Sequence, residues 1–321
     1  MSELKTLREL MDHYVANHDY GLRQTTIDMW LKPGVSKFEK WLERPALIDD
    51  LTAINVNSFI DWLKKITSSS AMIKGRRGPV LMLLRYAQEM QIAPPQNGRI
   101  RKVRVQRNIP TGWRVEEVQK LLETCLAQDV RTKSPDAQKG HHMSRIHNHL
   151  SSGPRVGLML AGIVSVAWDT TLRLGDILAM KWSDVEFDSQ GTARAHIVMS
   201  KTGYLQSVTI SKETIEILRQ IEAAMDGPTK LLLPWPYRRE KLYDWVRCYV
   251  REAGIRKGTL KFLRSGSASA AEKLERGAGK SALGHRSDWI SAAHYLDPSI
   301  VGIKDIARPS LFAKDPVNEK D

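Results

Sequence analysis

The chain has 321 residues and a formal net charge of +13, is 42% hydrophobic and 26% charged, and contains two cysteines. These values are ordinary for a soluble globular protein of two domains, and two distant cysteines exclude a disulfide framework and a cysteine-rich zinc site, in keeping with a reducing cytosol. The positive charge favours nucleic acid as a partner, although an anionic membrane surface would satisfy the same charge.

Residues 1–95 are predicted to form an all-helical domain. The amphipathic N-terminus, with its mixed charges, is unlike a secretory signal. Thr52 is a candidate helix N-cap, Pro33-Gly34 is expected to separate two helices, and Pro94-Pro95 should end the last one. Apolar residues recur at helical spacing in the segments 4–14, 27–31, 38–42, 52–63 and 71–90.

Residues 96–111 differ abruptly in composition from the helices before them. Their apolar side chains, such as Ile100 and Val103, are too few to bury a core, so we predict an extended basic linker. Its basic residues are Arg99, Arg101, Lys102, Arg104 and Arg107. Residues 1–110 carry a net charge of +7 and the remainder +6, as expected of a protein that engages DNA from two sides.

Residues 112–321 are predicted to form a second domain, beginning with a helix over 115–127. Residues 128–155 are polar and form too long a stretch for an ordinary connection, which predicts a mobile insertion. The spacing of its histidines matches no standard zinc pattern, so we predict no metal site. These histidines are His141, His142, His147 and His149.

The rest of the second domain mixes helices with a short β segment. An apolar helix is predicted over 156–168, too short to span a bilayer, and another helix over 175–182. Period-two segments at 193–200 and 206–210, joined by Lys201-Thr202-Gly203, predict a β-hairpin or small antiparallel sheet. The predicted fold class is therefore mainly α with a small antiparallel β-sheet.

Four separated pieces of the second domain carry residues suited to phosphate chemistry. They are Thr171-Leu172-Arg173-Leu174-Gly175-Asp176, Ser200-Lys201-Thr202-Gly203, Leu260-Lys261-Phe262-Leu263-Arg264, and Leu283-Gly284-His285 followed by His294-Tyr295. Their order and spacing resemble the catalytic core of tyrosine recombinases of the phage-integrase type. In that family an arginine begins a TxLRxxE/D helix and a lysine lies in a β-hairpin turn. An HxxR pair and an LGH step then precede a nucleophilic tyrosine. The resemblance covers residues 113–300 and extends more loosely over the N-terminal helices.

The resemblance implies an enzyme that cuts and rejoins DNA. Residues 1–95 would be a core-binding, SAM-like domain and residues 112–321 a mixed α+β catalytic domain, together forming a C-shaped clamp. Tyr295 would leave a 3′-phosphotyrosine and a free 5′-hydroxyl, with no metal, nucleotide or other cofactor. The resemblance also implies a homotetramer on double-stranded DNA with inverted-repeat sites, and a tail, 296–321, that docks on a neighbouring subunit. A prokaryotic or viral member would be cytoplasmic and nucleoid-associated.

The same resemblance assigns the other site residues. Arg173 and Arg264 would hold the scissile phosphate, because a guanidinium stays protonated and forks onto two oxygens. Lys201 would protonate the 5′-oxygen leaving group, and His285 would hydrogen-bond the phosphate or help to move a proton. Asp176 would orient Arg173. Phosphate-backbone contacts are expected from Lys74, Arg76, Arg77, Arg101, Lys102, Arg104 and Arg107.

Two features depart from the family pattern. Lys261 replaces the histidine of HxxR, as the related type IB topoisomerases allow, but a lysine accepts the nucleophile's proton only if its pKa is depressed. The segment Ser-Gly-Ser-Ala-Ser after Arg264 lacks the usual His-Thr. Two other functions therefore stay open: a type IB topoisomerase that relaxes DNA as a monomer, and a DNA-binding protein without catalysis.

Other tyrosines compete with Tyr295 as the nucleophile. A lone tyrosine on a C-terminal helix is ordinarily a half-buried aromatic residue, and Tyr204, Tyr243 and Tyr249 are of the same kind. The distance of Tyr295 from Leu-Gly-His is what favours it over these three.

Overall fold

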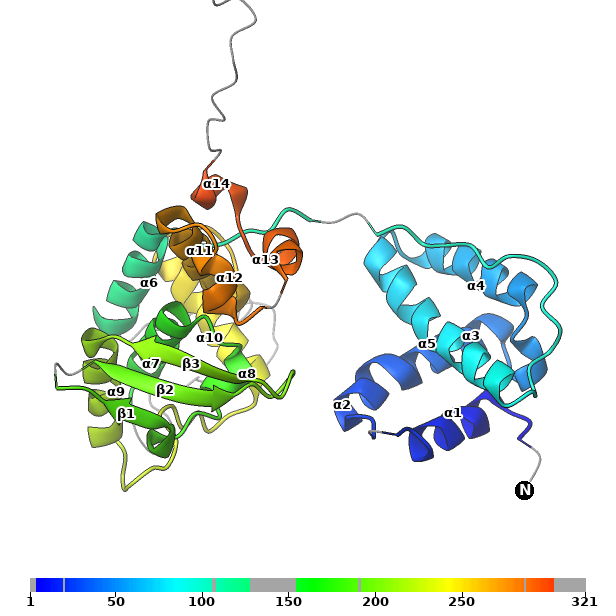
Figure 1. The fold of residues 1–321 in the computed structure, drawn as a ribbon, viewed down its shortest axis with the longest axis horizontal. Coiled ribbons are helices and arrows are strands. Elements are labelled where there is room, and N and C mark those ends of the chain that lie inside the picture. The colour runs from blue at the N-terminus through cyan, green and yellow to red at the C-terminus, as the bar shows by residue number, and fades with distance from the viewer. Residues whose placement is uncertain are drawn as a thin grey trace, which may run out of the picture. The chain divides into compact units, whose positions relative to one another are not determined.

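The computed structural model describes residues 4–19, 21–105, 108–127, 154–189, 192–285 and 287–302. They belong to two units, Met1–Asn108 and Ile109–Asp321, which we consider separately (Figure 1). The predicted insertion up to residue 153, with its four histidines, lies outside the described residues, as do Arg107 and the tail beyond residue 302.

The first unit is built from helices, as the apolar spacing predicts. Thr6 caps its first helix through a reciprocal capping box with Glu9, and Thr52 caps another by accepting from the backbone N–H of Asn55 at 3.2 Å. The elements are α1 (Leu7–Ala16), α2 (Gln24–Thr26), a π-helical turn η1 (Ile27–Leu31), α3 (Lys32–Leu42), a 3-10 turn η2 (Ile48–Asp50), α4 (Ala53–Ile66) and α5 (Ser70–Glu89).

Helix α3 runs through Pro33 and Gly34, where the sequence predicted a break. Pro33 lies in the first turn of α3, directly after the π-helical turn η1, so the missing proline N–H falls where the helical hydrogen-bond pattern changes. Gly34 is where α3 crosses α5, since a Cβ there would overlap with the ring of Pro79. The prediction was wrong because a glycine that lets two helices approach has the same sequence signature as one that ends a helix.

Part of the predicted linker packs onto the core of the first unit. Ile100 and Val103 pack onto the buried residues of this unit. Between them, Arg101 donates to the carboxylate of Asp61 and to the backbone carbonyl of Asn57, each at 2.5 Å. The chain around Arg101 is therefore attached along α4.

The second unit combines helices with one small sheet, which confirms the predicted fold class. The helix predicted over 175–182 is shorter in the structure, a single turn followed by a 3-10 turn, because the chain then enters the sheet. The elements are α6 (Val115–Ala127), α7 (Val156–Thr170), α8 (Leu174–Ile177), η4 (Trp182–Asp184), β1 (Val185–Phe187), β2 (Ala193–Val198), β3 (Leu205–Ile210), α9 (Lys212–Ala223), α10 (Arg239–Glu252), α11 (Leu260–Leu274), α12 (Ala278–Leu283), α13 (Asp288–His294) and α14 (Pro298–Val301).

The sheet is antiparallel in the order β1-β2-β3. The predicted hairpin is β2 and β3, with Ala195 opposite Val208, and side chains of β2 alternate between the core and the outer face. The turn closes with the carbonyl of Met199 accepting from the N–H of Gly203 at 2.8 Å, and Gly203 has a φ of +71° that favours glycine. The three-residue β1 is too short to leave a period-two signal.

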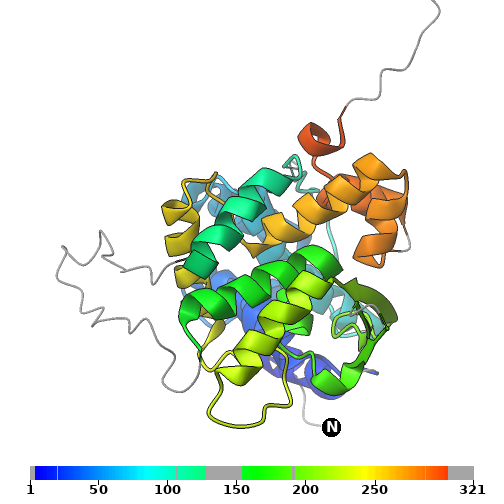
Figure 2. The ribbon, with the colours of Figure 1, turned by 90° about the vertical axis from the view of Figure 1, so that its left-hand side faces the viewer.

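Helix α7 lies at the centre of the second unit. It packs against α6, α9, α11 and β3 (Figure 2). Nearly all of its side chains are buried. This burial explains why it is apolar all round rather than along one stripe. No helix in the described part of the chain combines the length and apolar character that a membrane span requires.

Candidate active site

Arg173 occupies the point where two helices of the second unit meet. Thr171 ends α7 in the left-handed conformation, with φ of +50°, and Arg173 then has the extended backbone of an N-cap at the start of α8. Its guanidinium lies 3.7 Å from the sulfur of Met199 at the hairpin turn. A cation at a helix N-terminus is repelled by the positive end of the helix dipole. An anion that binds here relieves this repulsion, so the position of Arg173 favours anion binding.

Arg264 is buried on α11, with 5% of its surface exposed. Its guanidinium donates to the carbonyl oxygen of Thr171 and, at 3.0 Å, to that of Leu283, while its Nε has no partner. These two carbonyls come from the ends of α7 and α12 and fix the direction of the guanidinium. The LxxLR segment thus places a cation against two of the other three motif pieces, those that contain Thr171 and Leu283.

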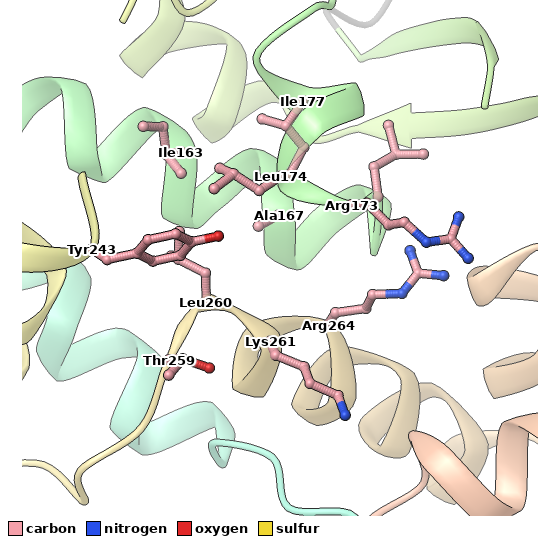
Figure 3. Close-up of a pocket in the computed structure, with 11 residues that line it drawn as sticks. Ile163, Ala167, Arg173, Leu174, Ile177, Tyr243, Thr259, Leu260, Lys261 and Arg264 are labelled. Atoms are coloured by element: carbon pink, nitrogen blue, oxygen red, sulfur yellow. The ribbon is translucent and has the colours of Figure 1, made fainter. Parts of the chain in front are cut away.

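The guanidinium groups of Arg173 and Arg264 lie close to each other (Figure 3). Burial, and then the charge of Arg173, lower the pKa of Arg264 to about 10, and Tyr295 and Asp176 only partly oppose this effect. Figure 3 shows both guanidinium groups at one end of a cavity of about 180 Å³, with the Lys261 ammonium extending on the same side. Because like charges held together in a partly dry site repel, the arrangement favours an anion between them.

Tyr295 lies among the cationic residues of this site. It ends α13, and its half-buried ring is 5.1 Å from the Arg264 guanidinium carbon and 5.6 Å from the Lys261 Nζ. The ring of His285 packs edge to face against it, with centroids 4.9 Å apart. The structure therefore brings together Tyr295 from the end of α13, Arg264 and Lys261 from α11, and His285 from the loop after α12.

His285 is electrically neutral at neutral pH. Its Nδ1 lies 3.0 Å from the hydroxyl oxygen of Ser291 on α13. Burial, followed by the charges of Arg264, Arg173 and His294, lowers its pKa to about 4. A neutral imidazole can both donate and accept a hydrogen bond, so His285 suits proton movement better than charge stabilisation.

Asp176 has a different contact from the one the sequence predicted. Its carboxylate is 97% buried and accepts from the backbone N–H of Ser200 at 2.9 Å, while the second carboxylate oxygen has no hydrogen-bond partner. It therefore does not orient the Arg173 guanidinium by a hydrogen bond. It fixes instead the start of the turn that carries Lys201, whose side chain is exposed.

No protein-family model and no curated protein matches this sequence, but solved structures do. A lambda integrase tetramer bound to a Holliday junction matches with a TM-score of 0.63 and 18% identity, over 91% of this chain and 77% of that one. The Tn1549 transposon integrase in complex with circular intermediate DNA matches with a TM-score of 0.61 and 11% identity, over 91% and 95%. The XerH site-specific recombinase bound to its palindromic difH substrate matches with a TM-score of 0.54 and 18% identity, over 75% and 67%.

This chain has the tyrosine recombinase fold. Within this fold the competing tyrosines of the second unit lie in settings that differ from that of Tyr295. Tyr249 is buried in the core, Tyr204 lies at the exposed hairpin, and Tyr243 lines the opposite end of the cavity in Figure 3. The Tyr295 ring, by contrast, contacts the Arg264 guanidinium.

The recombinase fold places one further cation near Arg173 that the sequence did not single out. A Cβ on Gly175 would lie 3.2 Å from a guanidinium nitrogen of Arg239, so the exposed Arg239 side chain rests on α8 at Gly175, two residues after Arg173. In the sequence, this contact is marked by Gly175, whose lack of a side chain leaves room for the Arg239 guanidinium. This signal could not be used, because the residue that fills the space comes from α10, far along the chain.

The basic residues predicted to follow the DNA backbone belong to the first unit of the fold. On α5, Lys74 is exposed, and Arg76 and Arg77 are half-buried. Burial, followed by the charge of Arg85, lowers the pKa of Arg77, and its Nε has no hydrogen-bond partner. Lys102 and Arg104 are exposed, whereas the guanidinium of Arg101 is held by Asp61.

Proposed function

We propose that this protein is a site-specific DNA recombinase of the integrase type, which cleaves and rejoins strands through a covalent 3′-phosphotyrosine at Tyr295. The observation that carries the proposal is the contact of the Tyr295 ring with Arg264, Lys261 and His285, beside a second arginine that faces Arg264. A tyrosine among groups that attract a phosphate is what attack on a phosphodiester requires.

In the proposed reaction, the Tyr295 hydroxyl oxygen attacks the phosphorus of a DNA phosphodiester. The bond from phosphorus to the 5′-oxygen breaks, and that oxygen takes a proton from Lys201. Arg173 and Arg264 neutralise the non-bridging oxygens, whose negative charge increases in the transition state. The phosphotyrosine conserves the bond energy, so a 5′-hydroxyl of another strand can reverse the step without ATP or metal.

We propose that His285, rather than Lys261, accepts the proton that the Tyr295 hydroxyl loses. Without a substrate, burial and then the charges of Arg264 and Arg173 hold the pKa of His285 at about 4, too low for a base. A bound phosphate opposes these charges, raises that pKa, and makes the imidazole basic when the substrate is in place. Lys261 then contributes a positive charge beside Tyr295.

For the assembly, we propose a homotetramer on duplex DNA with inverted-repeat sites, each chain closing a clamp on the DNA. The solved lambda integrase tetramer on a Holliday junction supports this proposal through its shared fold. Basic residues on both units supply the charge that such a clamp needs.

Covalent trapping tests the proposed function. Nicked suicide duplexes tiled across the DNA flanking the gene are incubated with the wild type and with Tyr295→Phe, without metal or ATP, and run on a denaturing gel. We expect a protein–DNA adduct with the wild type and none with Tyr295→Phe, because the phenol oxygen is the group that bonds to phosphorus.

Three other outcomes would change the conclusion. An adduct that survives Tyr295→Phe would show that another tyrosine is the nucleophile. Tight, salt-sensitive binding without an adduct on any duplex would favour the non-catalytic DNA-binding protein. Relaxation of supercoiled plasmid lacking a special site would favour the type IB topoisomerase.

A further inference from the structure

The small residues that follow Arg264 on α11 contact two other parts of the chain. Gly266 lies directly against the backbone at Gly112 and Trp113. A Cβ on Gly266 would overlap with the backbone of Trp113, and a Cβ on Gly112 would overlap with the backbone of Gly266. The Ser267 hydroxyl donates to the carbonyl of Trp168 at 2.5 Å. The Ser-Gly-Ser-Ala-Ser segment thus has smaller side chains than the usual His-Thr. These small side chains let the backbone at Gly112 and Trp113 pass directly over α11 at the start of the second unit.

Ser269 connects this crossing to the chain that follows Tyr295. Its hydroxyl accepts from the backbone N–H of Asp297 at 2.7 Å and donates to the carbonyl of Ser265 at 2.6 Å. Ser269 is fully buried, so these hydrogen bonds are shielded from water. Breaking one of them leaves a buried polar group without a partner, which is unfavourable.

The carboxylate of Asp297 completes the connection. One oxygen accepts from the backbone N–H of Gly112 at 2.9 Å, and the other accepts from the N–H and the hydroxyl of Ser299 at 2.9 and 2.8 Å. Burial alone would raise the pKa of Asp297, but the hydrogen bonds from Gly112 and Ser299 outweigh it and hold the pKa below its ordinary value. The residue, 4% exposed, is therefore a fully hydrogen-bonded carboxylate.

Tyr295 ends α13 and is followed two positions later by Asp297. The backbone N–H groups of Tyr295 and Leu296 both donate to the carbonyl of Ser291, at 2.9 and 3.1 Å. Leu296 then packs against α12, where a Cβ on Gly279 would lie 2.9 Å from it. With only Leu296 between Tyr295 and the fixed Asp297, the backbone of the tyrosine has little freedom to move.

We propose that Asp297 is a positioning residue for Tyr295, which latches the chain after the nucleophile onto α11 through Ser269 and onto Gly112 at the start of the second unit. The proposal rests on the proposed function of Tyr295. The latch holds the phenol against Arg264 and His285 before DNA arrives. Displacing a reacting atom by about 1 Å costs on the order of 100-fold in rate, so loss of the latch should affect the reaction more than it affects binding.

Asp297→Ala and Asp297→Asn test the latch in single-turnover adduct formation on the nicked duplex that traps the wild type. We expect Asp297→Ala to slow adduct formation on the order of 100-fold with DNA affinity unchanged. Asp297→Asn, which keeps one acceptor, should lie between it and the wild type. Amide hydrogen exchange at Gly112 and residues 295–299 should accelerate in the same order.

Val250→Ala is the matched control, because it lowers the stability of the same unit from a buried position on α10, away from the latch. Below its unfolding temperature it should form adduct at the wild-type rate. A wild-type rate in Asp297→Ala would overturn the positioning role alone, as would an equal loss in Val250→Ala. A wild type that forms no adduct on any duplex would overturn the proposed function and the latch with it.

Discussion

The neutral state of His285 depends on the two arginines that face it. Burial and the charges of Arg264 and Arg173 hold its pKa at about 4, against an ordinary value of 6.5. As the pH falls from about 6.5 to about 4, the unfolded chain takes up a proton at this position and the folded chain does not. His285 therefore contributes stability that is present above pH 6.5 and is lost as the pH falls through about 4.

His285→Gln should remove this part of the pH dependence. We expect the difference in free energy of unfolding between wild type and variant to be constant above pH 6.5 and to move in favour of the variant between about 6.5 and 4. Urea unfolding across that range measures it. Sulfate should bring the wild-type curve closer to that of the variant, because an anion between the arginines raises the pKa of His285. Parallel curves for the two proteins would contradict the prediction.

Single residues were predictable from the sequence to different degrees. The motif order identified Tyr295, Arg264, Lys261 and His285, which the structure brings into contact. The partner of Asp176 could not be predicted. Spacing along a helix places it near Arg173, but the N–H it bonds belongs to a turn that folding brings to α8 from elsewhere in the chain.

At the scale of elements, the packing of α3 on α5 depends on one glycine. Gly34→Ala should destabilise the first unit by about 1–3 kcal/mol, because the new Cβ overlaps with Pro79 and forces the helices apart. Gly75→Ala, in α5, is the matched control: nothing lies within 4 Å of its Cβ, so alanine should stabilise the helix by about 0.5–1 kcal/mol.

Amide hydrogen exchange in α3 and α5 measures both variants within the first unit. Exchange should be faster in Gly34→Ala and slower in Gly75→Ala. The same direction of change in both would mean that helix propensity, and not the crossing with Pro79, decides the effect at residue 34.

Periodic elements were predictable and tertiary crossings were not. The apolar run of α7 and the alternation of β2 and β3 follow from burial on all sides and on one side, respectively. The continuity of α3 through Gly34 and the small residues at 265–269 depend on what packs against them. Those contacts join residues far apart in the chain, and one sequence carries no local signal for them.

At the scale of the whole molecule, the positive charge is divided between the two halves of the chain. Residues 1–110 carry +7 and the remainder +6, so the electrostatic contribution to DNA binding does not come from a single tail. Each phosphate that a lysine or arginine neutralises releases counterions, which makes affinity depend on salt. The residues that contribute to this dependence are those whose charge is free to meet a phosphate.

The linker offers a direct comparison of free and occupied charges. Lys102 and Arg104 are exposed, whereas Arg101 is held by Asp61 and Asn57. For binding to a mixed-sequence duplex, we expect Lys102→Ala and Arg104→Ala each to make the slope of log affinity against log salt less steep by about 0.9. Arg101→Ala should leave the slope unchanged and instead accelerate amide exchange in α4, because its guanidinium bonds to that helix. A slope change for Arg101→Ala as large as for its neighbours would mean that Arg101 leaves Asp61 to bind DNA, and that the linker detaches from α4 in the complex.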